Sequence, residues 1–434
     1  MHGEGKDPLA RPLGLTAVTL SGIGIILGAG IYALIGTAAA SAGNAVWLSF
    51  ALSAVIALFT ALSYAELSSI YPKAGAEYEY TAAAVGGYIA FIVGWLIIFA
   101  GLVGAATVAL GFGGYVAVLS GYGAVPAAAA LICILTVILV IGVRESTAVA
   151  GLFTLIEGGG LILVIIAGVP YLGRVDYLEM PFGATGLFSA AALVFFAFMG
   201  FEEMVKFSEE TRDPEKTVPR ALLIALAVCT VLYILVCIAA VSVVGWEGLA
   251  ASGAPFAEVA SAAWGPSGAA VLSVIALFAT ANTVLLMLLA ASRISYGMAR
   301  SGVLPSLLSR VHRTRRTPWV AILAMAAGSV LFLFAGDIGF VANVTNFTLF
   351  ATFVIVNLAV IILRYREPDR VRPFPVPGRI AWVPVVPVLG IVSCLFLFLQ
   401  LTVEVMAIGT VLVIIGGIAA LLAGERADQE RGAA

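Results

Sequence analysis

Four glycines lie close together near the start of the chain, inside a run of apolar residues from about Leu15 to Ala40. Within the stretch SGIGIILGAGIY they are Gly22, Gly24, Gly28 and Gly30. Glycine in a helix interior costs about 1 kcal/mol relative to alanine. An interrupted helix frees backbone N–H and C=O groups, which hydrocarbon cannot satisfy. The glycines therefore predict an interruption whose freed groups face a cavity or bind a polar solute.

A second interruption is expected in VFFAFMGFEEMVKFSEE, residues 194–210, where Gly200 lies near the middle of an apolar run. The start of a half-helix presents N–H groups and a positive dipole end, which suit a carboxylate. Freed carbonyls suit an ammonium group. Together they match a zwitterionic amino acid, and paired interruptions of this kind are typical of a transporter binding site.

Helix packing is the alternative for the first stretch. Gly24 and Gly28 are four residues apart and form a GxxxG pattern, which is common where two membrane helices touch. The additional glycines and the matching interruption near Gly200 favour the binding hypothesis over packing alone.

The composition requires a membrane environment for these elements. Of 434 residues, 62% are hydrophobic and 11% are charged, whereas soluble domains are about half apolar and a quarter charged. Apolar runs of about 20 residues recur along the whole chain, so we expect an integral membrane protein in a lipid bilayer. The net charge of −2 gives no indication of nucleic acid binding. Zinc-binding and other catalytic spacings are absent from the sequence, and we expect no cofactor, no metal and no enzymatic activity.

We expect an all-α protein with twelve membrane-spanning helices and interruptions in helices 1 and 6. The spans are predicted at about 15–40, 45–70, 85–119, 124–142, 148–171, 186–207, 219–245, 268–298, 318–335, 338–364, 384–403 and 405–423. This arrangement places 21 of the 22 basic residues on one side, and only Arg174 on the other. Lysine and arginine concentrate in cytoplasmic loops, so both termini are expected to be cytoplasmic.

Eight stretches, in order along nearly the whole chain, resemble the amino acid–polyamine–organocation (APC) superfamily of amino acid permeases. The similarity is nearest to its cationic amino acid transporter branch. The stretches are GIGIILGAGIYALIG (22–36), YAELSSIYPKAGAEYEY (64–80), GVRES (142–146), FFAFMGFEE (195–203), SEETRDPEKTVPRA (208–221), TANTVLLMLLAASRISYGMARSGVLP (280–305), TPWVAIL (317–323) and RPFPVPG (372–378).

The resemblance implies the five-plus-five inverted-repeat fold of the leucine transporter, followed by two further helices. The expected organisation is a cytoplasmic segment, two five-helix repeats, helices 11 and 12, and a cytoplasmic tail. These correspond to residues 1–14, 15–185, 186–365, 366–423 and 424–434.

The resemblance also implies an amino acid substrate and its binding residues. The backbone around Gly28, Ala29 and Gly30 is expected to bind the substrate carboxylate, with Gly24 in the same interrupted segment. The ammonium group is expected at the carbonyls of the following residues: Ile23, Phe196, Ala197 and Met199.

Two acidic residues are candidates for coupling transport to an ion. Several family members carry a lysine in span five, where this chain has Glu157. An ionised carboxylate in hydrocarbon costs at least about 2.5–3.5 kcal/mol, so Glu157 is expected to be protonated or to face a polar cavity. A neutral structural role is the alternative. Glu202 precedes Lys206 by four residues and is expected to pair with it, which leaves Glu203 free to face the transport pathway.

These features predict secondary active transport of amino acids across the plasma membrane, by symport with protons rather than sodium. The sequence contains no GxxxxGK[ST] motif for ATP binding. Two alternatives remain open: an amino acid or polyamine antiporter, and a sensor that binds amino acids without transporting them.

Overall fold

The computed structural model describes residues 13–72, 76–142, 147–300, 302–380 and 383–432. The predicted cytoplasmic segment 1–14 therefore lies almost entirely outside the described residues. Most of the described chain is helical, because in hydrocarbon every backbone polar group must find its partner within the protein, and a helix provides it locally.

Most helices follow one another with short connections, several of them single turns of 3₁₀-helix, and the longest connections run from α11 to α12 and from α13 to α14. In chain order the helices are α1 (Leu15–Leu27), α2 (Gly30–Ala42), η1 (Gly43–Ala45), α3 (Val46–Ile70), α4 (Ala76–Val85), α5 (Gly87–Ser120), α6 (Ala124–Ile141), α7 (Thr147–Gly168), η2 (Val169–Tyr171), α8 (Gly183–Val194), η3 (Phe195–Phe198), η4 (Phe201–Glu210), α9 (Pro214–Ala251), α10 (Pro255–Trp264), α11 (Pro266–Arg300), η5 (Ser306–Ser309), α12 (Trp319–Phe332), α13 (Ile338–Arg366), α14 (Val385–Phe398) and α15 (Val403–Gly432).

Nine helical stretches of the described chain are long and apolar enough to cross a membrane, by length and composition. The chain is therefore a multi-pass membrane protein. Three shorter apolar helices, α1, α12 and α14, accompany them. The helices α12 and α14 begin directly after Pro318 and Pro384, because proline lacks a backbone N–H and disfavours helix at the residue before it.

The all-α prediction is correct for nearly all of the structure, with one small exception. Strands β1 (Arg379–Ile380) and β2 (Val383–Pro384) form an antiparallel pair of two residues each. They lie in the proline-rich connection between α13 and α14, where a continuous helix is disfavoured.

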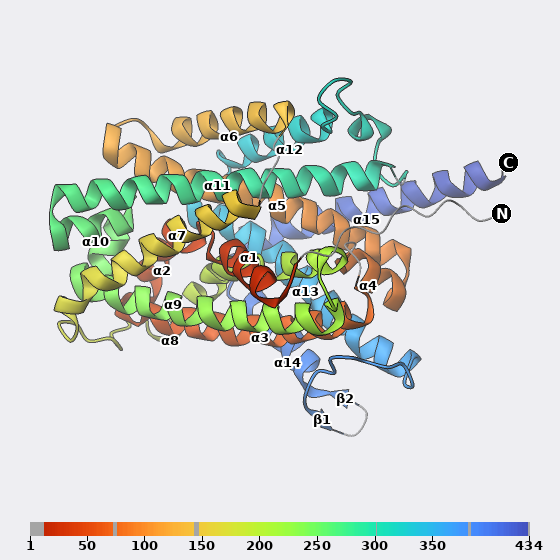
Figure 1. Ribbon diagram of the computed structural model, residues 1–434, viewed down its shortest axis with the longest axis horizontal. Coiled ribbons are helices and arrows are strands. Elements are labelled where there is room, and N and C mark those ends of the chain that lie inside the picture. The colour runs from red at the N-terminus through yellow and green to blue at the C-terminus, as the bar shows by residue number, and fades with distance from the viewer. Residues whose placement is uncertain (1–12, 73–75, 143–146, 301, 381–382, 433–434) are drawn as a thin grey trace.

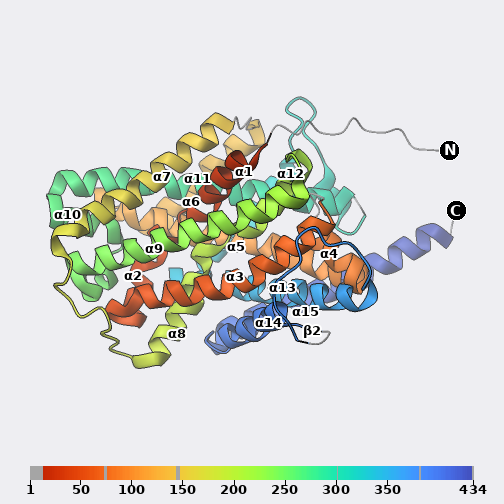
Figure 2. The same ribbon diagram turned by 60° about the horizontal axis from the view of Figure 1, so that its bottom comes forward.

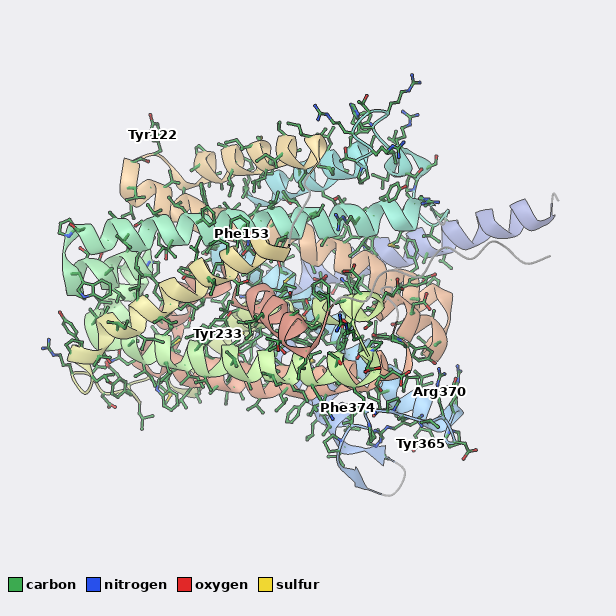
Figure 3. The ribbon with its side chains drawn as sticks, in the orientation of Figure 1. Tyr122, Phe153, Tyr233, Tyr365, Arg370 and Phe374 are labelled. Carbon is green, nitrogen blue, oxygen red and sulfur yellow. The ribbon has the colours of Figure 1, made fainter. Side chains whose placement is uncertain are left out.

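The long helices lie roughly side by side and give the molecule two distinct ends (Figure 1). One end, at the left of Figures 1 and 2, carries α10 and the connection between α7 and α8. The opposite end carries the connections from α11 to α12 and from α13 to α14. Figure 3 labels Tyr122 at the first end and Tyr365, Arg370 and Phe374 at the second.

The interior is packed with aromatic rings where α3, α13 and the 3₁₀ segments meet. Tyr64 contacts Phe201 and Phe353, each with ring centroids 5.8 Å apart. Phe195 contacts Phe350, with ring centroids 5.0 Å apart. Edge-to-face rings at these separations add to the energy of apolar burial. They hold the segment 195–210 against the surrounding long helices.

Candidate functional site: two interrupted segments in contact

The first segment of interest is the junction between α1 and α2. The helix α1 ends at Leu27 and α2 begins at Gly30, so the backbone between them lacks the regular helical hydrogen bonds. Ala29 N–H donates to Thr283 Oγ1 of α11 at 3.0 Å. The carbonyl of Ile26 accepts from the hydroxyl of Tyr233, on α9, at 2.6 Å. Side chains from two other helices thus satisfy this backbone.

The second segment lies between α8 and α9, where α8 ends at Val194 and two 3₁₀ segments follow. Gly200 separates them with φ of +117°, a conformation that glycine adopts without steric cost. The N–H of Gly200 donates to Glu202 Oε2 at 2.9 Å, and Met199 N–H donates to the Phe196 carbonyl at 3.2 Å. This segment satisfies much of its own backbone.

The two segments touch each other. A Cβ atom added to Gly30 would lie 2.8 Å from Ala197 Cα, and one added to Gly200 would lie 2.7 Å from Ile25 Cγ2. Contacts below 3.0 Å require displacement of the neighbour, so only glycine allows this approach. The structure therefore places the backbone of Gly30 against that of Ala197, and Gly200 against Ile25.

One hydroxyl group joins the two segments. Tyr233 Oη lies 2.6 Å from the Ile26 carbonyl and 3.0 Å from the Ala197 carbonyl. A phenol carries a single proton, so it donates to only one of these carbonyls at a time. Figure 3 labels Tyr233 on α9 and Phe153 on α7, on either side of α1, and both helices pack against α1. Tyr233 is thus placed where the first and second segments meet.

The remaining predicted binding residues are less central. Ile23 and Met199 are partly exposed, and the Ile23 carbonyl lies 3.8 Å from Cys229 Sγ. A Cβ atom on Gly24 would lie 2.0 Å from Thr154 Oγ1 of α7. Gly24 therefore serves close packing between α1 and α7, in agreement with the GxxxG alternative for that one residue.

Glu157 lies in the middle of α7 with 1% of its surface exposed. Its Oε1 accepts from Asn282 Nδ2 at 3.1 Å, and its backbone carbonyl accepts from the Tyr32 hydroxyl of α2 at 2.6 Å. None of the ion pairs found among the described residues includes it. Asn282 directly precedes Thr283, whose hydroxyl accepts a hydrogen bond from the N–H of Ala29. One turn of α11 therefore contacts both the buried carboxyl group and the first segment.

The predicted ion pair between Glu202 and Lys206 is wrong, and so is the prediction that Glu203 has no partner. Lys206 Nζ lies 2.5 Å from Glu203 Oε1. Glu202 Oε2 instead accepts a hydrogen bond from the N–H of Gly200. The reason is local geometry: residues 201–210 form a 3₁₀-helix, in which side chains three residues apart are aligned, whereas the prediction assumed an α-helix.

Several residues of the site were not predicted from the sequence. They are Tyr32, Tyr233, Asn282 and Thr283, each of which contacts one of the two segments or Glu157 from another helix. The sequence feature that could have identified these residues is a polar side chain inside a long apolar span, because such a group needs a hydrogen-bond partner in the membrane. That feature identifies the residue without identifying its partner.

Comparison with known proteins identifies the family. The family model described as amino acid permease matches residues 13–421. This chain belongs to that family. The permease is 35% identical to the branched-chain amino acid permease BcaP of Bacillus subtilis over 420 residues, which cover 92% of this chain and 90% of BcaP.

Other relatives of the permease have different names. A methylthioribose transporter of Bacillus subtilis is 33% identical, with 91% of this chain and 89% of the relative covered. The vacuolar cationic amino acid transporter 2 of Arabidopsis thaliana is 31% identical, covering 86% of this chain and 62% of that protein. The relatives are transporters, so the family is one of transport proteins and not of enzymes.

A solved structure supports the fold. The crystal structure of a mutant manganese transporter from Eremococcus coleocola superimposes with a TM-score of 0.64, covering 97% of this chain and 95% of that chain. Its sequence identity to the permease is 13%, so the similarity concerns the fold alone.

Proposed function

We propose that this permease transports amino acids across the plasma membrane by alternating access, with proton symport as the driving force. The observation that carries the proposal is the direct contact between the two interrupted segments, which brings the start of α2 at Gly30 against the backbone of Ala197 in η3. A zwitterionic amino acid needs a helix start for its carboxylate and carbonyls for its ammonium group. Relatives named as amino acid permeases and cationic amino acid transporters support the substrate class.

The proposed architecture has twelve crossings. We assign residues 15–185 and 186–365 to two five-helix repeats of opposite orientation, with the interrupted segments as helices 1 and 6. Residues 366–423 are the two appended helices, and the termini (1–14 and 424–434) are cytoplasmic. Support comes from the nine long apolar stretches together with α1, α12 and α14, and from the separation of the basic residues.

This topology is testable by cysteine labelling. Single cysteines within 246–266 should react with a membrane-impermeant reagent added outside, and cysteines within 207–217 only after the membrane is opened. External reaction in 207–217 would contradict both the twelve-span arrangement and the inverted repeat.

The proposed binding mode uses the backbone at the contact. The N–H groups of Gly28, Ala29 and Gly30 bind the substrate carboxylate, beside the hydroxyl of Thr283. The ammonium group binds the carbonyls of Ile23, Phe196, Ala197 and Met199, with Tyr233 as the switchable donor between the two segments. A substrate ammonium takes the carbonyl that the Tyr233 proton leaves free.

We propose an uncharged, apolar substrate side chain. A Cβ atom on Gly104 of α5 would lie 3.3 Å from Met287 Sδ and 3.6 Å from Phe196 Cε2, so apolar side chains of α11 and η3 converge beside the contact. Apolar walls favour an aliphatic side chain and leave a charged one without a partner. L-leucine is therefore the first probe, with L-arginine as the contrasting one.

Glu157 is the proposed proton carrier, and protons rather than sodium are the proposed coupling ion. It is buried, it is linked to the first segment through Asn282 and Thr283, and by the resemblance it matches the position at which several family members carry a lysine. Glu203, the other candidate, already pairs with Lys206. A carboxyl group at this depth favours the neutral form unless a cation or water reaches it.

Proteoliposomes test this function. Labelled L-leucine should accumulate inside when the interior is made alkaline, and a protonophore should abolish the accumulation. Uptake that requires amino acid or polyamine on the opposite side would identify the antiporter. Stabilisation by L-leucine in a thermal-shift assay without any flux would identify the sensor instead.

A further inference from the structure

A polar cavity of about 240 Å³ lies apart from the contact between the two segments. Its lining comes from α2, α8, the start of α13 and the start of α15. The polar side chains in it are Thr37, Ser41, Ser189, Asp337, Asn343 and Thr402. A single water needs only about 10–15 Å³ of such volume, so the cavity has room for a small solute.

The acceptor groups on one side of the cavity suit an ammonium group. Asp337 Oδ1 caps α13 by accepting from Phe340 N–H at 2.8 Å, which leaves its second oxygen for a ligand. Asn343 Oδ1 is buried without a hydrogen-bond partner among the described residues, and so is Oδ1 of the fully buried Asn346, one turn further along α13. Buried acceptors of this kind require a donor.

The cavity also contains groups that suit a carboxylate. The helix α15 starts at the cavity, after Thr402, and its N-terminus provides a positive dipole end, whereas the N-terminus of α13 is already capped by Asp337. The hydroxyls of Thr37, Ser41 and Ser189 add donors. Carboxylate and ammonium therefore each find groups of matching character in one cavity.

The cavity approaches the proposed central site along α8. Leu193 lines it, and Phe196 follows three residues later, which corresponds to about 4.5 Å of helix. Asn346 Nδ2 of α13 donates to the carbonyls of Ala192 and Leu193 at 2.7 and 3.0 Å. A solute in the cavity is thus about one helical turn from the interrupted segments.

We propose that this cavity is a second, weaker binding site for the zwitterionic head group of the substrate, on its way to the central site. The inference rests on the proposed function, because it takes an amino acid as the transported solute. Asp337 and Asn343 Oδ1 bind the ammonium group, and the hydroxyls with the N-terminus of α15 bind the carboxylate. The side chain of the solute remains toward the open mouth of the cavity.

The test is calorimetric titration of the purified permease with L-leucine up to millimolar concentration. The unaltered protein should bind two molecules per chain, one tightly and one weakly. Asp337→Asn keeps the helix cap, since asparagine caps as well as aspartate, but removes the charge. It should weaken the second site about tenfold, as expected for a lost hydrogen bond to a charged group. Ser189→Phe should fill the cavity and abolish that site.

Asp176→Asn is the matched control. Asp176 is an exposed acid that lies outside the cavity lining and accepts from Leu178 N–H at 2.9 Å. Its substitution should leave both sites unchanged. In proteoliposomes, Asp337→Asn should raise the apparent KM for uptake without lowering the rate at saturation.

The outcomes separate this inference from the proposed function. One site in the unaltered protein, or a weak site that survives both cavity substitutions, would overturn the second site while leaving the central one intact. Absence of any L-leucine binding would overturn the proposed function and this inference together. Loss of the tight site in Ser189→Phe, with the weak site retained, would also contradict the assignment.

Discussion

The two interrupted segments satisfy their backbones in different ways. Between α1 and α2, the partners come from other helices: Thr283 of α11 and Tyr233 of α9. Between α8 and α9, Glu202 caps Gly200 from within the same segment, and 3₁₀ turns supply further bonds. The first segment therefore depends on the positions of its neighbours, whereas the second takes more of its bonds from its own residues, with Tyr233 also bonding the Ala197 carbonyl.

This difference indicates a division of roles. A segment whose backbone is bonded by side chains of α9 and α11 must change these hydrogen bonds when either helix moves. We therefore expect the conformation of the first segment to change together with the positions of α9 and α11. A segment held mainly from within is expected to keep its backbone conformation when its neighbours move. We infer that the first segment couples binding to conformational change and that the second is a fixed binding surface.

The largest effect is expected at Gly28. A Cβ atom there would lie 3.3 Å from the Ile25 carbonyl and 3.4 Å from Thr283 Oγ1, so Gly28→Leu places a large side chain against the N–H groups of the first segment. L-leucine binding should weaken by about a hundredfold or more, about 2.8 kcal/mol. Titration calorimetry beside a melting curve measures affinity and stability separately.

Gly22→Ala is the control for Gly28. The added Cβ atom meets Met204 Cε at 2.2 Å, so it disturbs packing away from the substrate groups. It should lower the melting temperature while leaving affinity unchanged in the folded fraction. If Gly28→Leu also lowers the melting temperature and leaves affinity unchanged, the first segment is a packing contact and does not bind the substrate.

The next largest effect concerns Glu157 of α7, which bonds Asn282, the neighbour of the Thr283 that bonds the first segment. Glu157→Gln keeps the shape of the protonated acid but cannot titrate. Accumulation of L-leucine driven by a pH gradient should be lost, and the pH dependence of binding should flatten. Exchange of labelled for unlabelled L-leucine should persist, because exchange needs no proton cycle.

Glu247→Gln, at an exposed acid on α9, is the control for Glu157 and should accumulate L-leucine normally. Accumulation by Glu157→Gln at the unaltered level would make Glu157 structural. The coupling would then be sought elsewhere, and the first segment would lose its proposed role.

Much of the fold was accessible from the sequence, because apolar runs and the basic residues between them carry local information. The glycines at 28 and 30 also marked where α1 ends and α2 begins. The partners of those residues were not accessible. Thr283 is 254 residues from Ala29, and no local pattern links them. The pairing of Lys206 with Glu203 was missed because a 3₁₀-helix and an α-helix align different residues.

A moderate effect is expected for Tyr233→Phe, which removes the hydroxyl shared by the two segments. It leaves the Ile26 and Ala197 carbonyls without this donor, so unfolding free energy should fall by about 1–3 kcal/mol. Affinity for L-leucine should also fall, by about tenfold. Tyr115→Phe removes a buried hydroxyl that donates to the Tyr32 carbonyl at 3.2 Å. That variant should lose stability but keep affinity, and equal affinities in the two variants would contradict the bridging role.

The smallest effect concerns the second segment and pH. Glu77 of α4 is 2% exposed and accepts from the Tyr64 hydroxyl at 3.2 Å. Burial raises the pKa of Glu77; Lys206 nearby lowers it and Glu203 raises it. The neutral form is therefore favoured more in the folded protein than in the unfolded chain. Its stabilisation is complete below the ordinary glutamate pKa and is lost as pH rises through the raised pKa.

Melting curves should therefore show the unaltered protein losing stability with rising pH in that window, and Glu77→Gln losing less, by a few degrees at most. Glu79→Gln on the same helix should follow the unaltered protein. A pH profile that Glu77→Gln leaves unchanged would show that this acid does not titrate beside the second segment.

The most direct test of the central claim is an experimental structure with L-leucine bound. We expect the carboxylate within hydrogen-bonding distance of the N–H groups of Gly28–Gly30, with the ammonium group at the carbonyls of Ala197 and its neighbours. The Tyr233 hydroxyl should then remain bonded to only one of its two carbonyls. L-leucine bound elsewhere, with the contact between the two segments unchanged and unoccupied, would contradict the account.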